Sequence, residues 1–205
     1  MSTTHIAARP LADRFIPGQG LAAEIARIAS ANLLMVLCAW IALPLPGTPV
    51  PVTGQTFGVL LVAALFGARR GSLTMVLYLL EGAAGLPVFQ PFGAPGAMRF
   101  FGPTAGYLLA FPVAALATGW LVEHASARSH ASKTKTHLSQ WIPPLLCGEA
   151  VIFAGGCAWL ALFFHFSFSS ALKIGLLPFA PGEVVKLALL LAALRGLELA
   201  RPARN

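Results

Sequence analysis

Long apolar segments, separated by short stretches that hold most of the charge, constrain this chain more than any other feature. Hydrophobic residues make up 57% of its 205 residues and charged residues 10%, whereas about 25% of the residues in a soluble domain are charged. A helix needs about 20 predominantly apolar residues to cross a bilayer. The sequence therefore predicts an all-α, polytopic membrane protein with six transmembrane helices, at residues 24–43, 56–68, 71–86, 104–122, 141–166 and 181–195.

The basic residues indicate which ends of these helices face the cytoplasm. Eleven Lys and Arg lie near the two termini, in the turn at 69–70 and in the polar loop 123–140, whereas only Arg99 and Lys173 lie in the other connections. Because positive charge accumulates in cytoplasmic loops, we expect both termini to be cytoplasmic in a multi-pass protein of the cell (plasma or inner) membrane. The membrane domain is predicted over 24–197, between an amino-terminal tail at 1–23 and a carboxyl-terminal tail at 198–205. The first tail lacks the apolar core and cleavage site of a signal peptide.

Three connections are left for the outer side. Residues 44–54 contain four prolines and no charge, and residues 87–103 contain four phenylalanines, four prolines and the single charge of Arg99. A solvated loop is seldom this apolar, so we expect the 87–103 connection to fold back as a lid or pocket wall. The third connection is 167–180. The outer face is therefore predicted to carry a small-molecule pocket with mostly apolar walls.

An acid and a base lie in the last apolar segment, close to this predicted pocket. Glu183 and Lys186 are three residues apart and so share one face of a helix. Charged groups are costly within a bilayer and usually face a protein interior or a polar cavity, where they mark functional sites. The pair therefore predicts a binding site, although an ion pair that only holds helices together remains the alternative.

Several function classes lack their sequence signals. The basic residues form no contiguous patch, so we expect no nucleic acid partner. The chain has no GxxxxGK[ST] phosphate loop and no HExxH or GxSxG pattern, and its cysteines and histidines do not have the spacing of a metal site. An intramembrane enzyme that uses Glu183 or Glu149 as general acid or base would need a partner nucleophile or metal, which the sequence does not supply.

Small residues recur every four positions at the start of the first apolar segment, at Ala22, Ala26 and Ser30. Such a stripe lets another helix approach closely. It is consistent with packing inside the bundle or with docking of a separate membrane partner.

Four stretches together resemble one known family. PLPGTPVPVTGQTFGVLL, RRGSLTMVLYLLEGAAGLPVF, FFGPTAGYLLAF and PFAPGEVVK are similar, in order and spacing, to the BioY proteins, the substrate-binding S components of energy-coupling factor (ECF) transporters for biotin. The resemblance covers residues 24–197. It departs from the family pattern at Glu183, where aspartate is expected, at Ala105 in place of a glycine, and at Gly54, a position that is often leucine.

This resemblance implies a six-helix protein that captures biotin at the outer face. A membrane-embedded coupling protein and two cytoplasmic ATPases would drive uptake, and the chain itself would need no cofactor. Glu183 would accept a hydrogen bond from the N–H groups of the biotin ureido ring, and Lys186 would donate to its oxygen. An S component for a different vitamin is the alternative within the same fold.

Further residues are assigned to the substrate site through the same resemblance. Gln55, Tyr107 and Thr104 are expected as additional contacts, and Tyr78 and Glu81 as lining. Plain helix packing is the alternative for Gln55, Tyr107, Tyr78 and Glu81. Arg99 would either meet the valerate carboxylate of biotin or extend into solvent.

Overall fold

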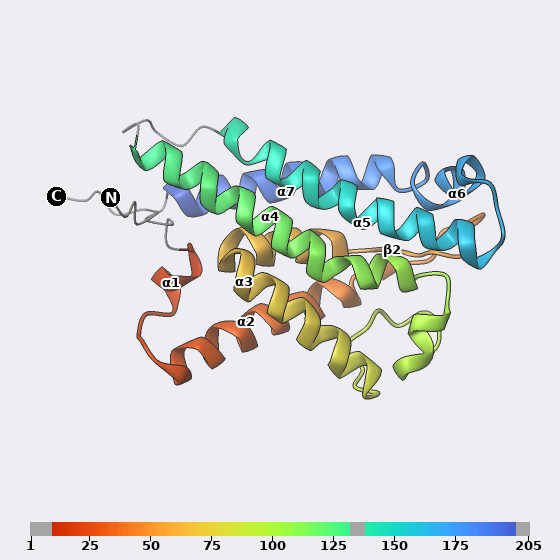
Figure 1. The fold of residues 1–205 in the computed structure, drawn as a ribbon, viewed down its shortest axis with the longest axis horizontal. Helices are drawn as coiled ribbons and strands as arrows, with labels where there is room; N and C mark the ends of the chain where they lie inside the picture. Colours follow the sequence, from red (N-terminus) through yellow and green to blue (C-terminus); the bar gives the residue numbers. More distant parts are fainter. Residues whose placement is uncertain (1–9, 132–137, 200–205) are drawn as a thin grey trace, which may run out of the picture.

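The computed structural model describes residues 10–131 and 138–199, and within them helices dominate (Figure 1). Four helices are long and apolar enough to cross a membrane, and the bent pair α6 and α7 would make a fifth span in the described part of the chain. The prediction of an all-α membrane protein is confirmed. The elements are α1 (Ala12–Phe15), α2 (Leu21–Trp40), β1 (Ala42–Leu43), β2 (Val52–Thr53), α3 (Gln55–Ala83), η1 (Gly96–Phe101), α4 (Ala105–Ala131), η2 (Leu138–Gln140), α5 (Ile142–Phe163), α6 (Phe168–Gly175) and α7 (Ala180–Leu199).

Helix α3 consists of two arms that fold back on each other at Gly67, which has φ 84° and ψ 177°. A Cβ atom on Gly71 would lie 3.1 Å from the Cα of Ala63, so the arms are in contact. The second arm begins with the amide of Ala68 donating to the Glu123 carboxylate at 2.9 Å. Two short helices were predicted here, but with their turn at residues 69–71. Each arm is shorter than a usual bilayer crossing, and the count of six spans stays a prediction.

Helix α4 packs closely against both α3 and α5 because glycines line the contacts. A Cβ atom on Gly119 would collide with the backbone of Ala68, and one on Gly106 would collide with Trp159. In lipid the hydrophobic effect does not drive helices together, so their association depends on close van der Waals packing, which small residues allow. These contacts hold α4 at the centre of the bundle, beside the two arms of α3 and along α5 (Figure 1).

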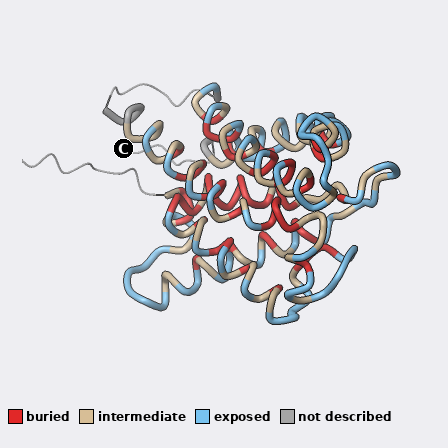
Figure 2. The backbone as a smooth tube through the Cα atoms, turned by 45° about the vertical axis from the view of Figure 1, so that its right-hand side comes forward, coloured by how far each residue is buried: buried red, intermediate tan, exposed pale blue. Residues whose placement is uncertain are grey.

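Burial follows the pattern expected for a bundle surrounded by lipid. Fully buried side chains such as Met35, Tyr78 and Leu160 form the interior, where Figure 2 shows the buried segments gathered. Large apolar side chains such as Leu37 and Val113 remain more than half exposed on the outside. An exposed apolar surface of this extent is unusual in a soluble monomer and is suited to contact with hydrocarbon.

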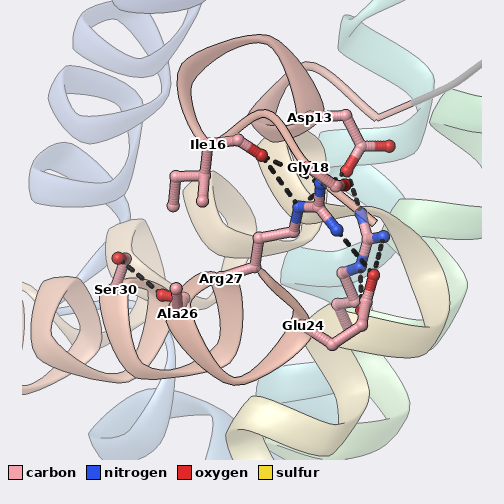
Figure 3. Close-up of polar contacts among 8 residues, drawn as sticks. Asp13, Ile16, Gly18, Glu24, Ala26, Arg27 and Ser30 are labelled. Atoms are coloured by element: carbon pink, nitrogen blue, oxygen red, sulfur yellow. Dashed lines mark hydrogen bonds and ion pairs between the residues drawn. The ribbon is translucent and has the colours of Figure 1, made fainter. Parts of the chain in front are cut away.

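The amino-terminal segment is fixed to the bundle at the end opposite β2 and α6 (Figure 1). Arg27 is 4% exposed and donates to the carbonyls of Ile16 and Gly18, both at 2.9 Å (Figure 3). Its guanidinium also pairs with Asp13 at 3.0 Å and with Glu24 at 2.7 Å. The described part of the predicted tail is therefore folded, and the first long helix begins at Leu21 instead of residue 24.

The remaining boundaries differ from prediction mainly at this same end. Helix α4 continues to Ala131, into the polar stretch predicted as a loop, and residues 132–137 of that stretch lie outside the described residues. Helix α7 continues to Leu199. Polar residues do not end a helix by themselves, because Ala is a strong helix former and long side chains such as Glu and Arg lose little rotamer freedom in a helix. The carboxyl-terminal end of α7 lies at the same end of the bundle as α1 (Figure 1), and the side of the membrane that this end faces stays a prediction.

Candidate functional site

A cavity lies among β2, the start of α3, the 87–103 connection, α4, α5 and the start of α7. About 540 Å³ of space in and around it is not filled by atoms, open solvent at its mouth included. Most of its wall is apolar and aromatic, with a few polar side chains between, which is the usual composition of a small-molecule site. The lining residues are Val50, Pro51, Thr53, Gln55, Thr56, Phe89, Gln90, Arg99, Thr104, Tyr107, Leu108, Phe111, Ile152, Phe153, Phe179, Glu183 and Lys186.

The acid and the base of α7 meet inside this cavity, and a hydroxyl from α3 joins them. The Lys186 ammonium lies 2.7 Å from Glu183 Oε1 and donates to Thr56 Oγ1 at 3.0 Å. The Thr56 hydroxyl in turn donates to Glu183 Oε2 at 2.8 Å. The side chains of Lys186 and Glu183 are 16% and 12% exposed. The three groups form a nearly buried polar cluster at the junction of α3 and α7, and charge-assisted bonds of this kind are the strong ones.

Gln55 and Tyr107 also line the cavity, and each is oriented by a hydrogen bond. The Gln55 amide donates to the hydroxyl of Tyr78 at 2.8 Å. The Tyr107 hydroxyl donates to the carbonyl of Gly175 at 2.7 Å, which ties α4 to the end of α6. Thr104 lines the wall just before α4 begins. A second tether to α6 comes from Thr48, whose hydroxyl donates to the carbonyl of Ile174 at 2.8 Å.

Arg99 is buried in the wall and does not extend into solvent, so that part of the prediction is wrong. Its guanidinium donates to the carbonyl of Gln90 at 2.9 Å and to that of Phe92, and it lies 5.6 Å from the centre of the Phe89 ring. These bonds close the 87–103 connection into a compact cavity wall, with Gly93 at φ 107° where the guanidinium passes. Burial lowers the pKa of Arg99 from its ordinary value, but an arginine stays charged at any physiological pH. Its Nε is buried without a hydrogen-bond partner.

Two of the predicted site residues lie away from the cavity. Tyr78 is fully buried behind Gln55, which it orients. The Glu81 carboxylate accepts from the side-chain amide of Asn32 at 2.6 Å and so connects α2 to α3. Six of the eight predicted residues are brought together at the cavity: Gln55, Arg99, Thr104, Tyr107, Glu183 and Lys186.

Sequence reasoning missed Thr56 and most of the apolar wall. Thr56 follows Gln55 at the first turn of α3, and its hydroxyl joins both charged groups of α7. An uncharged threonine in an apolar helix gives no signal that separates it from an ordinary packing residue. Phe153 and Phe179 pack with ring centres 6.3 Å apart, and they come from segments that are far apart in sequence, so only the folded chain reveals them as neighbours.

The small-residue stripe lies on the free face of α2. Ala22, Ala26 and Ser30 are all exposed, and the Ser30 hydroxyl is turned back onto the carbonyl of Ala26 at 2.7 Å (Figure 3). The stripe is therefore not used for packing inside the described bundle.

Comparison with known proteins identifies the family of this chain. The family model described as the BioY family matches residues 7–203. The chain belongs to the BioY family. The biotin transporter BioY of Thermotoga maritima is 36% identical over 171 residues, which are 82% of this chain and 93% of the relative. The biotin transporter BioY2 of Lactococcus lactis subsp. cremoris is 38% identical over 162 residues, which are 78% of this chain and 81% of the relative.

A solved structure has the same fold as this BioY family member. The crystal structure of the S component for biotin from an ECF-type ABC transporter superposes with a TM-score of 0.74 at 21% identity, over 90% of this chain and 96% of the solved one. The resemblance predicted aspartate at the position of Glu183. The carboxylate of Glu183 nevertheless reaches both Lys186 and Thr56, so the cluster accommodates the additional methylene group.

Proposed function

We propose that this protein captures biotin at the outer face of the membrane and takes it up as the S component of an ECF-type transporter. The observation that carries the proposal is the Glu183–Lys186–Thr56 cluster, which presents a carboxylate and an ammonium to an apolar cavity. The cyclic urea of biotin needs both, because it has two N–H donors and one carbonyl acceptor. The relatives named as biotin transporters support the same ligand.

The cavity suggests how biotin would lie. The ureido N–H groups would donate to Glu183 and the ureido oxygen would accept from Lys186, with Gln55, Thr104 and Tyr107 as further polar contacts. Aromatic side chains of the wall would cover the fused rings. Arg99 would meet the valerate carboxylate, because it is a buried cation at the cavity with one N–H still without a partner.

Titration of the detergent-solubilised protein with biotin by isothermal calorimetry tests the ligand. We expect saturable binding, with one site per chain, at micromolar or lower biotin. Competition by other vitamins tests the alternative of a different ligand in the same fold. Absence of heat from biotin together with binding of another vitamin would contradict the proposed ligand and leave the capture function in place.

The partners in this proposal are the ECF transmembrane coupling protein and the two ATPase subunits, which would supply ATP hydrolysis. The protein would act as a substrate-binding subunit of the cell (plasma or inner) membrane, and not as an enzyme. The free face of α2 at Ala22, Ala26 and Ser30 is the proposed docking surface. Its support is that the stripe is exposed and that close helix contact in lipid depends on small residues.

Enlarging a residue of this stripe should weaken docking without affecting biotin capture. Ala26→Leu is expected to reduce co-purification of the coupling protein about tenfold, because even 1.4 kcal/mol lost from the interface has that effect. The matched control is Ala193→Leu, an equally exposed position on α7. Biotin titration of both variants shows that the site is intact. Equal complex yields from the two variants would place the docking surface elsewhere.

A further inference from the structure

A second cavity opens on the side of the bundle between α5 and the α6–α7 pair. About 960 Å³ of space in and around it is not filled by atoms, open solvent included, and its walls are almost entirely apolar. The exception is a pair of carboxyl groups, Glu149 on α5 and Glu183 on α7. Glu183 and Phe153 belong to the walls of both cavities. This second cavity, called the lateral cavity below, therefore adjoins the candidate binding site at these two residues.

Glu149 brings a second carboxyl group to the charged cluster. It lines the lateral cavity together with Glu183, within the range of electrostatic interaction with both Glu183 and Lys186. Among the side chains that the structure describes, its Oε1 is the one carboxyl oxygen that is buried without a hydrogen-bond partner. An unpartnered polar atom at a buried position is costly and asks for an explanation.

The charges near Glu149 do not balance if both carboxyl groups are ionised. Lys186 is the cation of the cluster, and it is already paired with Glu183. The other titratable groups around the lateral cavity are the Cys157 thiol on α5 and, next to it, the Tyr107 hydroxyl on α4. The segment from α6 contributes only apolar side chains to this wall. A second carboxylate would thus be an unpaired charge in apolar surroundings, where two neighbouring carboxyl groups do not both ionise.

We propose that Glu149 and Glu183 share one proton, which makes the contact between α5 and α7 a proton-binding site behind the candidate ligand site. The proton bridges the two carboxyl groups, so the buried Glu149 oxygen gains its missing hydrogen bond. Glu149, Glu183 and Lys186 are then neutral as a group. Glu149 is a positioning residue. It holds the Glu183 carboxylate from the side of the lateral cavity, while Glu183 and Lys186 line the candidate ligand cavity. No bond other than this hydrogen bond is formed.

The first test needs no ligand. Infrared spectroscopy of the purified protein distinguishes the carbonyl stretch of a protonated carboxylic acid from that of a carboxylate. We expect a protonated carboxyl band at neutral pH in the wild-type protein, its loss as the pH is raised, and its absence in Glu149→Gln. The matched control is Glu81→Gln, which removes a carboxylate that is already partnered by Asn32 and should leave the band in place.

The second test rests on the proposed function and measures linkage between the proton and biotin. One linked proton makes the biotin dissociation constant rise by as much as tenfold per pH unit once the pH is high enough to remove it. Glu149→Gln is expected to lose this dependence, because the amide cannot ionise. Glu149→Asp keeps a titratable group and should retain the pH dependence; it serves as the test variant if Glu149→Gln does not fold. Cys157→Ser removes the nearby thiol and should also retain it.

The outcomes separate this proposal from the assignment of biotin. A protonated carboxyl band that disappears in Glu149→Gln, in a protein that does not bind biotin, would support the shared proton and contradict the ligand. Absence of the band from the wild-type protein, or its persistence in Glu149→Gln, would overturn the shared proton whatever the ligand is. Biotin affinity that falls equally with pH in the wild-type and Glu149→Gln proteins would overturn the linkage.

Discussion

Replacing Lys186 by alanine is expected to weaken biotin binding by about 100-fold or more. The ammonium donates to Glu183 at 2.7 Å and to Thr56 at 3.0 Å in a nearly buried cluster. Removing one member of a buried ion pair costs about 3–5 kcal/mol, because the remaining charge is left without compensation. In the proposed mode, the ureido oxygen of biotin loses its charged donor as well. Calorimetric titration in detergent measures the change.

Two controls separate the charge from other effects of this substitution. Lys186→Met keeps most of the side-chain volume and loses only the ammonium, so it should lose nearly as much affinity as the alanine variant. Lys173→Ala removes an exposed lysine of α6 and should bind biotin like the wild type. Affinity within twofold of the wild type in Lys186→Ala would show that the pair serves only to hold α7 against α3.

Replacing Gly67 by alanine is expected to destabilise the fold by about 3 kcal/mol or more. The backbone at Gly67, with φ 84° and ψ 177°, is essentially restricted to glycine. A Cβ atom there would also collide with the Glu123 carboxylate, which accepts the amide of Ala68 at the start of the second arm of α3. Strain and the loss of that bond act at the same position. Thermal unfolding in detergent should show a midpoint lower by roughly 10 °C for a chain of this size.

The control for this second prediction is Gly196→Ala on α7. A Cβ atom on Gly196 meets nothing within 4 Å, and alanine favours a helix over glycine by about 1 kcal/mol. The midpoint of this variant should be unchanged or slightly higher. Equal stability of Gly67→Ala and the wild type would mean that the turn between the arms of α3 can form with an ordinary backbone.

The sequence predicts the helices well and the turns less well. Apolar length locates the start of α4 at Ala105 and the end of α5 at Phe163 to within a few residues, because a helix satisfies all of its backbone hydrogen bonds within its own segment in lipid. The turn inside α3 was expected at the conspicuous Arg69–Arg70 pair. It lies at Gly67 instead, because the turn needs a backbone conformation that is essentially limited to glycine. Arg70 instead pairs with Asp13 and Glu24, each at 2.6 Å. No local pattern predicts these partners, which are distant in sequence.

The candidate site was predicted through its charges. Glu183 and Lys186 were recognisable because ionisable groups are rare in an apolar helix, and the structure brings them to the cavity. Glu81 was also expected at the site, but its carboxylate accepts a hydrogen bond from Asn32 and so connects α2 to α3. Charge alone does not specify which face of a helix meets the cavity. Thr56 and the aromatic wall required the fold, since their residue types are equally common in ordinary helix packing.

Two hydrogen bonds determine how freely the end of α6 can move. Consecutive carbonyls there, those of Ile174 and Gly175, accept the Thr48 and Tyr107 hydroxyls from two separate segments of the chain. A movement of this helix end breaks both bonds together, whereas a displacement of the Thr48 segment or of α4 alone breaks only one. The last turn of α6 is thus fixed at two adjacent carbonyls, so the loss of either hydroxyl would leave it held by the other.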